Sequence, residues 1–315
     1  MVAAMSDTLE LVVTLELEGE RLDRAIIKLA SGMSRAKLRA AIEVGAVRVD
    51  GRRRPKGAPV RAGEKITLET AGIPDADAPA VPDPSAALEV RFEGANVLVV
   101  DKPAGQPTAP IRSGETGTLV NALVARYPEL AGVGYSPREP GIVHRLDTDT
   151  SGLVVVARNA GTFDELKGAL KDERIHKTYF VICAEDGLPD DGTIEFPLTN
   201  HPKDQRRVYA CVHPLDVKRY SPRPAVTRYR VADRKGVWAL VEADAPKALR
   251  HQIRVHFASI GHPLAGDELY GGAPIAALGR HALHSARVRF AGSSSVEAFD
   301  VSSPLPPALA ALLEA

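Results

Sequence analysis

The chain has 315 residues, of which 44% are hydrophobic, so it is long enough for two domains with separate cores. Its two cysteines, Cys183 and Cys211, exclude a disulfide framework or a cysteine-rich zinc site and suit a reducing compartment. Residues 1–10 lack a signal-peptide pattern and no apolar run reaches about 18 residues, so we expect a cytoplasmic protein without a membrane span.

The formal net charge is zero, but the charge is unevenly distributed along the chain. Residues 20–69 hold nine arginines and four lysines against six acidic residues, a net charge of +7, so the other 265 residues sum to −7. Such asymmetry predicts a basic nucleic-acid-binding module attached to a near-neutral body. A merely solubilising basic surface is the alternative.

A small N-terminal domain is predicted over residues 9–69. Apolar residues at helical spacing indicate a helix over 22–29. Ser34 is a suitable N-cap for a second helix over 35–44, which Gly45 would end. Strands are expected around these helices, at residues 9–17, 47–49 and 60–68.

Basic side chains of this domain are candidates for contacts with RNA phosphates. They lie outside the apolar stripe of the second helix or follow the Asp50-Gly51 turn, and they are Arg35, Lys37, Arg39, Arg52 and Arg53. The two helices, the Val-x-Val-Asp-Gly strand and the later run at 63–66 resemble the S4-like RNA-binding domain, named after a protein of the small ribosomal subunit. Its second helix and adjoining loop contact RNA, and phosphate contacts supply affinity without reading sequence.

Residues 70–87 are rich in proline, alanine and aspartate, and no amphipathic period survives in them. We therefore expect a semi-extended linker that lets the N-terminal domain move.

The second domain is expected to span residues 88–315. Short apolar runs and helical spacing predict its first elements, which are strands at 97–100, 153–157 and 177–182 and helices at 118–126 and 163–170.

A basic loop and a further helix follow these elements. The loop, at 197–208, contains Lys203 and Arg206, which suit contact with an RNA backbone; an ordinary charged surface loop is the alternative. The helix begins near residue 251 and should end at Gly261. Histidines at 251, 256 and 262 do not share a helical face, so we expect no metal site there.

The most specific pattern is His-Arg-Leu-Asp-Thr-Asp-Thr-Ser-Gly at residues 144–152, which lies between a Pro-Gly turn and a buried strand. Polar groups in a loop held by a rigid sheet are a common arrangement of catalytic residues. Arg145 and Asp147 could also form a simple surface ion pair. Asp147 and Asp149 could suggest a calcium site or a glycosidase pair, but the sequence offers no further ligand at calcium-loop spacing.

This pattern matches His-Arg-Leu-Asp-x-x-Thr-Ser-Gly, so the chain resembles the RluA-type pseudouridine synthases. The Lys-Pro-x-Gly turn at 102–105, the Lys-x-Tyr pair at 177–179 and the segment 251–271 resemble further motifs of that family. The resemblance implies an α+β fold, in which a mixed, largely antiparallel sheet is flanked by helices. It also implies isomerisation of uridine in structured RNA without a cofactor or a metal.

The resemblance carries site residues over to three positions as catalytic groups. The family's catalytic aspartate maps to Asp147, and its salt-bridge partner maps to Arg254. Tyr179, in the Lys-x-Tyr motif, could stack on the target base, although tyrosine also commonly fills strands as a packing residue. The motif arginine, Arg145, would fill the space that a flipped uridine leaves or hold its phosphate, since the target base must leave its stack.

One segment departs from the family pattern. The family usually reads Thr-Gly-Arg-x-His-Gln, whereas residues 247–252 read Lys-Ala-Leu-Arg-His-Gln, so Leu249 replaces the arginine. Arg250, one position later, and Lys247, two positions earlier, could supply the missing charge from a shifted direction, with Arg250 at the rim of the cleft. The alternative is that the contact has been dropped. The arrangement of an S4-like domain followed by this second domain resembles the RluD and RluC branches of the family. That resemblance implies a synthase that acts on large-subunit ribosomal RNA. The alternatives are a non-catalytic RNA-binding or ribosome-assembly factor and a tRNA-directed synthase.

Overall fold

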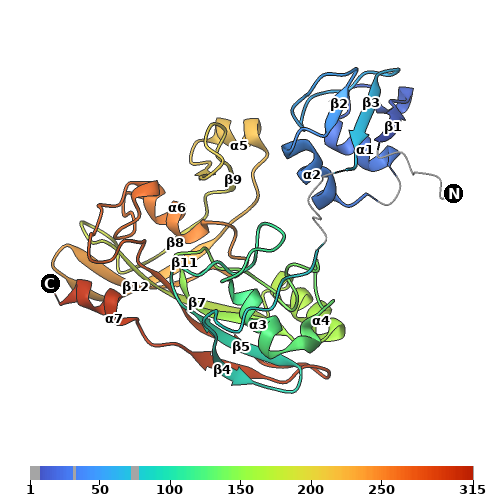
Figure 1. Ribbon diagram of the computed structural model, residues 1–315. Coiled ribbons are helices and arrows are strands. Elements are labelled where there is room, and N and C mark those ends of the chain that lie inside the picture. The colour runs from blue at the N-terminus through green and yellow to red at the C-terminus, as the bar shows by residue number, and fades with distance from the viewer. Residues whose placement is uncertain (1–7, 31–32, 72–77, 315) are drawn as a thin grey trace. The chain divides into compact units, whose positions relative to one another are not determined.

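A computed structural model describes residues 8–30, 33–71 and 78–314, and the side chains of residues 35 and 36 are outside the described part. The chain divides into two compact units (Figure 1). The first ends at Ala80 and also includes Ile111–Glu115, and the second comprises Val81–Pro110 and Thr116–Ala315. Each unit is described by itself.

The N-terminal unit packs two helices on a three-stranded sheet. The sheet has the antiparallel order β1-β3-β2. The elements are β1 (Thr8–Val12), the 3-10 turn η1 (Leu15–Leu17), α1 (Leu22–Leu29), α2 (Arg35–Glu43), β2 (Val47–Val49) and β3 (Lys65–Glu69). Both predicted helices are confirmed, and Ser34 caps α2 by accepting a hydrogen bond from the Lys37 N–H. The S4-like identity of this unit stays a prediction.

Two strands of this unit are shorter than the sequence indicated. The strand expected over 9–17 ends at Val12, because Leu15–Leu17 coil into a 3-10 turn. The strand expected over 60–68 begins at Lys65, because Gly63 takes a positive φ of 85° in a turn. The core of the unit is still continuous, since Leu22, Ile26, Leu38, Ile66 and Leu68 are all buried in it.

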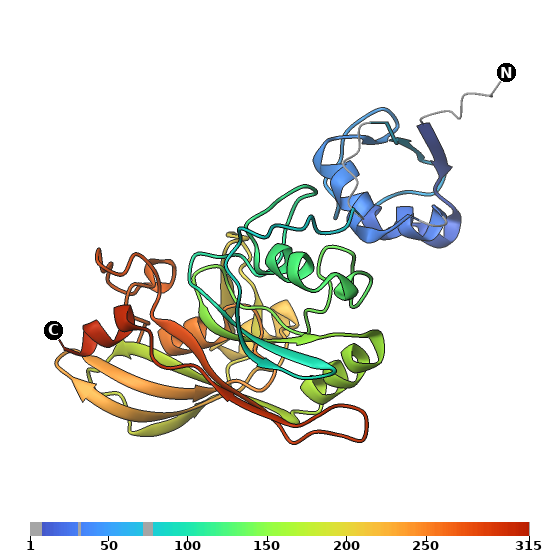
Figure 2. The same ribbon diagram turned by 60° about the horizontal axis from the view of Figure 1, so that its bottom comes forward.

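The second unit is built on one nine-stranded sheet, whose long strands lie side by side in Figure 2. Its order is β4-β5-β6-β13-β7-β12-β11-β8, with β14 beside β13; the β6–β13 pair is parallel and the other described pairs are antiparallel. This confirms the α+β fold with a mixed, largely antiparallel sheet. The strands are β4 (Glu89–Glu93), β5 (Val97–Lys102), β6 (Ser151–Ala157), β7 (Ile175–Ala184), β8 (Asp191–Ile194), β11 (Thr227–Lys235), β12 (Trp238–Asp244), β13 (Leu283–Phe290) and β14 (Phe299–Ser302).

Helices and a small hairpin surround this sheet. Helices α3 and α4 lie together against one side of it (Figures 1 and 2). Side chains from α4, such as Phe163 and Leu166, pack on Val155 and Val288 of the sheet. The remaining elements are α3 (Leu119–Arg126), η2 (Pro128–Leu130), α4 (Ala160–Lys171), the hairpin β9 (Leu198–Asn200) and β10 (Val208–Ala210), α5 (Pro214–Tyr220), α6 (Gln252–Ser259), η3 (Glu268–Tyr270), α7 (Pro307–Ala310) and η4 (Ala311–Leu313).

Part of the predicted linker is hydrogen-bonded to the second unit. The Asn121 side-chain amide donates to the Val81 carbonyl at 2.6 Å, and the Gln106 amide donates to the Ala87 carbonyl at 2.9 Å. Residues 72–77 of that linker lie outside the described residues. The domain boundaries stay predictions.

Among the helices that the structure describes, none is long and apolar enough to cross a membrane.

Candidate active site

The signature loop is fixed where it enters the buried strand β6. The His144 Nε2 accepts a hydrogen bond from the Val155 N–H at 3.1 Å, and burial lowers the pKa of His144 to about 3, so its ring is neutral. Gly152 ends the loop with a φ of 111°. A Cβ at this position would lie 2.3 Å from the Ser285 carbonyl oxygen, so only glycine allows β6 and β13 to approach.

A buried lysine ties the loop to the turn after β5. The Nζ of Lys102 donates to the carbonyls of Pro103, Gln106 and Thr148 at 2.8–3.0 Å. The Thr148 carbonyl also accepts from the Gly105 N–H at 2.9 Å. Burial lowers the pKa of Lys102 to about 8. The Lys-Pro-x-Gly turn therefore fixes the backbone next to Asp147.

Asp147 is paired with Arg254 of α6. The Arg254 Nη1 donates to Asp147 Oδ2 at 3.1 Å, while its Nε and Nη2 donate to the two oxygens of Asp267 at 2.7 and 2.8 Å. The Arg254 side chain is buried, and Asp147 is 26% exposed. Burial opposes the charge of Arg254, but its bonds to Asp267 raise the pKa above the ordinary value. The carboxylate therefore faces a fixed positive charge and keeps access to solvent.

Tyr179 lies near this pair on β7. Its side chain is buried, and burial together with the charge of Asp147 raises the pKa of its phenol. The phenol is also hydrogen-bonded to Ser285 of β13. The structure thus brings the three predicted catalytic residues of one unit together, from a loop, a strand and a helix. Whether each acts in catalysis stays a prediction.

Three further residues at this site have no role that the sequence predicts. The His251 Nε2 lies 3.6 Å from Asp147 Oδ2, and its Nδ1 lies 2.8 Å from the Tyr270 hydroxyl. The Arg254 guanidinium stacks 5.2 Å from the centre of the Tyr270 ring, and Asp267 orients it from behind. All three belong to the motif-like segment 251–271, and its unassigned polar positions are the signal that could have pointed to them.

The residues of the second unit that were predicted to contact RNA are exposed, and one of them, Arg250, is hydrogen-bonded to the backbone of a loop. Arg145 is exposed and paired with Glu139. Lys203 and Arg206 are exposed in the loop between β9 and β10, as expected for a basic loop. The Nη2 of Arg250 donates to the carbonyls of Gln205 and Arg206, at 2.8 and 2.5 Å. Arg250 thus holds that loop in this structure, instead of standing free at the rim of the cleft.

The predicted RNA contacts of the N-terminal unit are also exposed where described. Lys37, Arg52 and Arg53 are exposed, and Arg39 is paired with Glu43 at 2.7 Å on α2. The side chain of Arg35 lies outside the described residues. Within the described ranges, no cluster of three histidine, cysteine or acidic residues could hold a metal ion.

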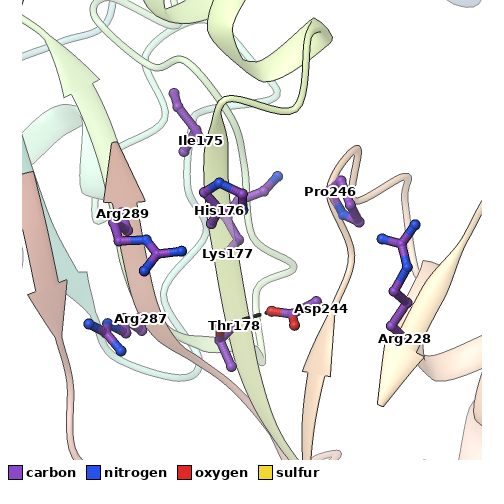
Figure 3. Close-up of a pocket in the computed structure, with 9 residues that line it drawn as sticks. All are labelled: Ile175, His176, Lys177, Thr178, Arg228, Asp244, Pro246, Arg287 and Arg289. Atoms are coloured by element: carbon purple, nitrogen blue, oxygen red, sulfur yellow. Dashed lines mark hydrogen bonds between the residues drawn. The ribbon is translucent and has the colours of Figure 1, made fainter. Parts of the chain in front are cut away.

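A separate basic pocket of about 210 Å³ lies over β7, β11, β12 and β13 (Figure 3). Its lining residues are Ile175, His176, Lys177, Thr178, Arg228, Asp244, Pro246, Arg287 and Arg289. The Thr178 hydroxyl donates to Asp244 at 2.8 Å. The lining includes none of Asp147, Tyr179 and Arg254, so this pocket is separate from the Asp147 site.

Known proteins resemble this chain over most of its length. A model of the family described as RNA pseudouridylate synthase matches residues 96–259. The "Ribosomal large subunit pseudouridine synthase D" of Nitrosomonas europaea is 35% identical, over 98% of this chain and 88% of its own length. The protein of that name from Neisseria meningitidis serogroup A is also 35% identical, over 94% of this chain and 78% of its own length.

A solved structure supports the fold. "Human RNA Pseudouridylate Synthase Domain Containing 1" superposes with a TM-score of 0.57 at 23% identity, over 72% of this chain and 88% of its own. At that identity the likeness concerns the fold alone. The family match and the relatives, together with the signature loop, lead to one conclusion. The chain belongs to the RNA pseudouridylate synthase family and is an RNA pseudouridine synthase.

Proposed function

We propose that this protein converts uridine to pseudouridine in large-subunit ribosomal RNA, with Asp147 as the reacting carboxylate. The observation that carries the proposal is an ion pair between Asp147, in the signature loop, and Arg254, in α6. The substrate class follows from two relatives named for the large ribosomal subunit, which match 94% or more of this chain. We also propose that it works in the cytoplasm, since both cysteines are free thiols.

The isomerisation needs an ionised carboxylate close to the ribose. The bond between uracil N1 and ribose C1′ breaks, the base rotates and a bond from C5 to C1′ forms. C5 then loses its proton and N1 gains one, so that the product is an isomer of uridine. Asp147 either attacks C1′ or removes a ribose proton, and both paths require it to be ionised. Arg254 places a positive charge 3.1 Å from Asp147 Oδ2. The electrons stay within the substrate, so the reaction requires no redox cofactor.

The other residues have distinct proposed roles. Tyr179, buried beside Asp147, would limit the movement of the released uracil between cleavage and rejoining. Arg145, exposed on the same loop, would fill the space left by the flipped base or hold its phosphate. Lys203 and Arg206 would bind the RNA backbone, together with Arg35, Lys37, Arg39, Arg52 and Arg53 of the N-terminal unit.

The test is a conversion assay. Purified wild-type protein and Asp147→Asn are each incubated with a transcript of large-subunit rRNA, and pseudouridine is located by base-specific chemical probing. Wild-type protein should modify one or a few uridines, and the variant none. Wild-type protein that binds the transcript without modifying it would favour a non-catalytic assembly factor. Conversion of tRNA but not of rRNA would favour a tRNA-directed synthase.

A further inference from the structure

His251 lies beside the Asp147 carboxylate, next to Arg254. Both groups approach the same oxygen of Asp147, because Arg254 Nη1 lies 3.1 Å and His251 Nε2 lies 3.6 Å from Oδ2. Among the described residues, no hydrogen bond reaches Oδ1. One oxygen is thus held by the protein, and the other is left for the substrate.

The tautomer of His251 follows from its second neighbour. The Tyr270 hydroxyl accepts a hydrogen bond from the Val208 N–H at 2.7 Å and lies 2.8 Å from His251 Nδ1. A phenol has one proton to donate, and the described residues offer it no acceptor besides His251 Nδ1. The ring of His251 is largely buried, and burial lowers the pKa, which favours the neutral form. A neutral ring that accepts at Nδ1 carries its proton on Nε2, facing Asp147.

The backbone also supports a positioning role. His251 directly precedes α6 and has a φ of 53°, a left-handed conformation that is uncommon for residues other than glycine. This conformation lets the ring turn back to Asp147 while Arg254, one turn later, approaches the same carboxylate. A strained residue beside a reacting group commonly reflects a functional constraint.

We propose that His251 is a positioning residue for the isomerisation: Tyr270 holds it in the Nε2–H tautomer, and with Arg254 it fixes Asp147 Oδ2, so that Oδ1 faces the ribose. The proposal rests on the proposed function of Asp147. It adds a donor that the Asp147–Arg254 pair alone lacks. Substrate binding should shorten the 3.6 Å separation to a hydrogen bond, because catalytic hydrogen bonds often tighten when substrate binds.

Two variants separate this role from packing. In His251→Asn, the amide reaches only the position of Nδ1, so it can still accept from Tyr270 but does not reach Asp147. Asparagine also tolerates the positive φ, so backbone strain would not explain a loss of activity. In His251→Gln, the amide nitrogen reaches the position of Nε2 and restores the donor. Single-turnover rates should fall by roughly tenfold to a hundredfold in the Asn variant, as for a misplaced catalytic group, and less in the Gln variant.

RNA affinity should be unchanged in both variants, since neither alters a phosphate-binding residue. The proposal is overturned if His251→Asn turns over like wild type, or if the Gln variant is as slow as the Asn variant. Inactive wild-type protein would instead refute the proposed function. A second measurement does not depend on activity. The ¹⁵N chemical shifts of His251, assigned with the Asn variant, should show a protonated Nε2 in wild type and a partly protonated Nδ1 in Tyr270→Phe. Protonation of Nδ1 in wild type would disprove the assignment.

Discussion

Arg254 joins Asp147 to Asp267, two carboxylates from separate segments of the chain. Its Nε and Nη2 are bonded to Asp267, whose side chain is 1% exposed, and its Nη1 is bonded to Asp147, which is 26% exposed. Asp267 therefore fixes the buried edge of the guanidinium, and the opposite edge is oriented towards Asp147. Such preorganisation means that the ion pair need not be assembled when RNA binds.

Replacing Asp147 with Asn tests the reacting group, because it keeps the shape and removes the charge. We expect turnover to fall to background while RNA affinity changes little, since the residues proposed to bind phosphates lie elsewhere. The measurements are single-turnover conversion and filter binding on one transcript. Turnover that persists after deamidation back to Asp has been excluded by mass spectrometry would refute the assignment.

Arg254→Ala should abolish turnover and also destabilise the fold. It leaves Asp267 buried without its partner, and breaking a buried ion pair costs about 3–5 kcal/mol. The double variant Arg254→Ala/Asp267→Ala should recover part of the free energy of unfolding in urea denaturation, and no turnover. If the double variant regains activity as well as stability, Arg254 serves only to neutralise Asp267.

The resemblance in sequence predicts Asp147, Tyr179 and Arg254 as catalytic residues, and the structure places the three close together. Sequence does not reveal that Asp267 orients Arg254, because that pairing depends on how η3 packs against α6. Likewise, the spacing predicts a helix that begins near residue 251. The αL conformation of His251 instead excludes this residue from α6 and turns it towards Asp147. Periodicity predicts which residues form a helix, but not a single strained residue before it.

The same limit applies to the segment that departs from the family pattern. The sequence places Arg250 at the rim of the cleft, where a phosphate would lie. Its guanidinium instead meets two backbone carbonyls of the loop between β9 and β10. The Gln205 carbonyl is 45 residues earlier in the chain, a tertiary relationship that no local pattern encodes. By contrast, the helix α2 and its cap at Ser34 depend on local spacing and were predicted correctly.

Arg250→Ala should therefore weaken RNA binding indirectly, by loosening the loop that carries Lys203 and Arg206. We expect a higher KM with the saturated single-turnover rate largely kept. Proteolysis or hydrogen exchange should show faster opening of residues 201–207, and Lys203→Ala is a matched control that removes an exposed charge from the same loop. Normal binding with no turnover would mean that Arg250 acts in the chemistry.

Lys102→Met tests the buried lysine below the signature loop. The variant keeps an apolar stem but leaves buried carbonyls unsatisfied, which costs about 1–3 kcal/mol for such a group. The pKa of Lys102 is lowered to about 8, so between pH 8 and its ordinary range the unfolded chain binds more protons than the folded one. The free energy of unfolding of wild type should therefore rise with pH over that interval, relative to Lys102→Met.

Urea denaturation of both proteins from pH 7 to pH 10 measures this difference. Comparing the two proteins cancels the contributions of tyrosines and cysteines, whose raised pKa values act in the opposite direction. A constant difference in the free energy of unfolding across this range would show that Lys102 titrates normally. Lys102 would then stabilise the fold through its hydrogen bonds and packing, with no contribution from a shifted pKa.

Deletion of residues 1–80 tests whether the N-terminal unit binds phosphates. The remaining chain should fold, because the sheet core of the second unit draws its buried residues from Val97 onwards. Affinity for long rRNA should fall, and the plot of log affinity against log salt should flatten by about 0.7–0.9 for each phosphate that the protein no longer neutralises. A full-length control, Lys37→Ala/Arg52→Ala/Arg53→Ala, should reproduce part of the flattening while keeping the fold. An unchanged salt slope in the deletion would place the phosphate-binding residues on the second unit, with the loop between β9 and β10 as the next segment to test.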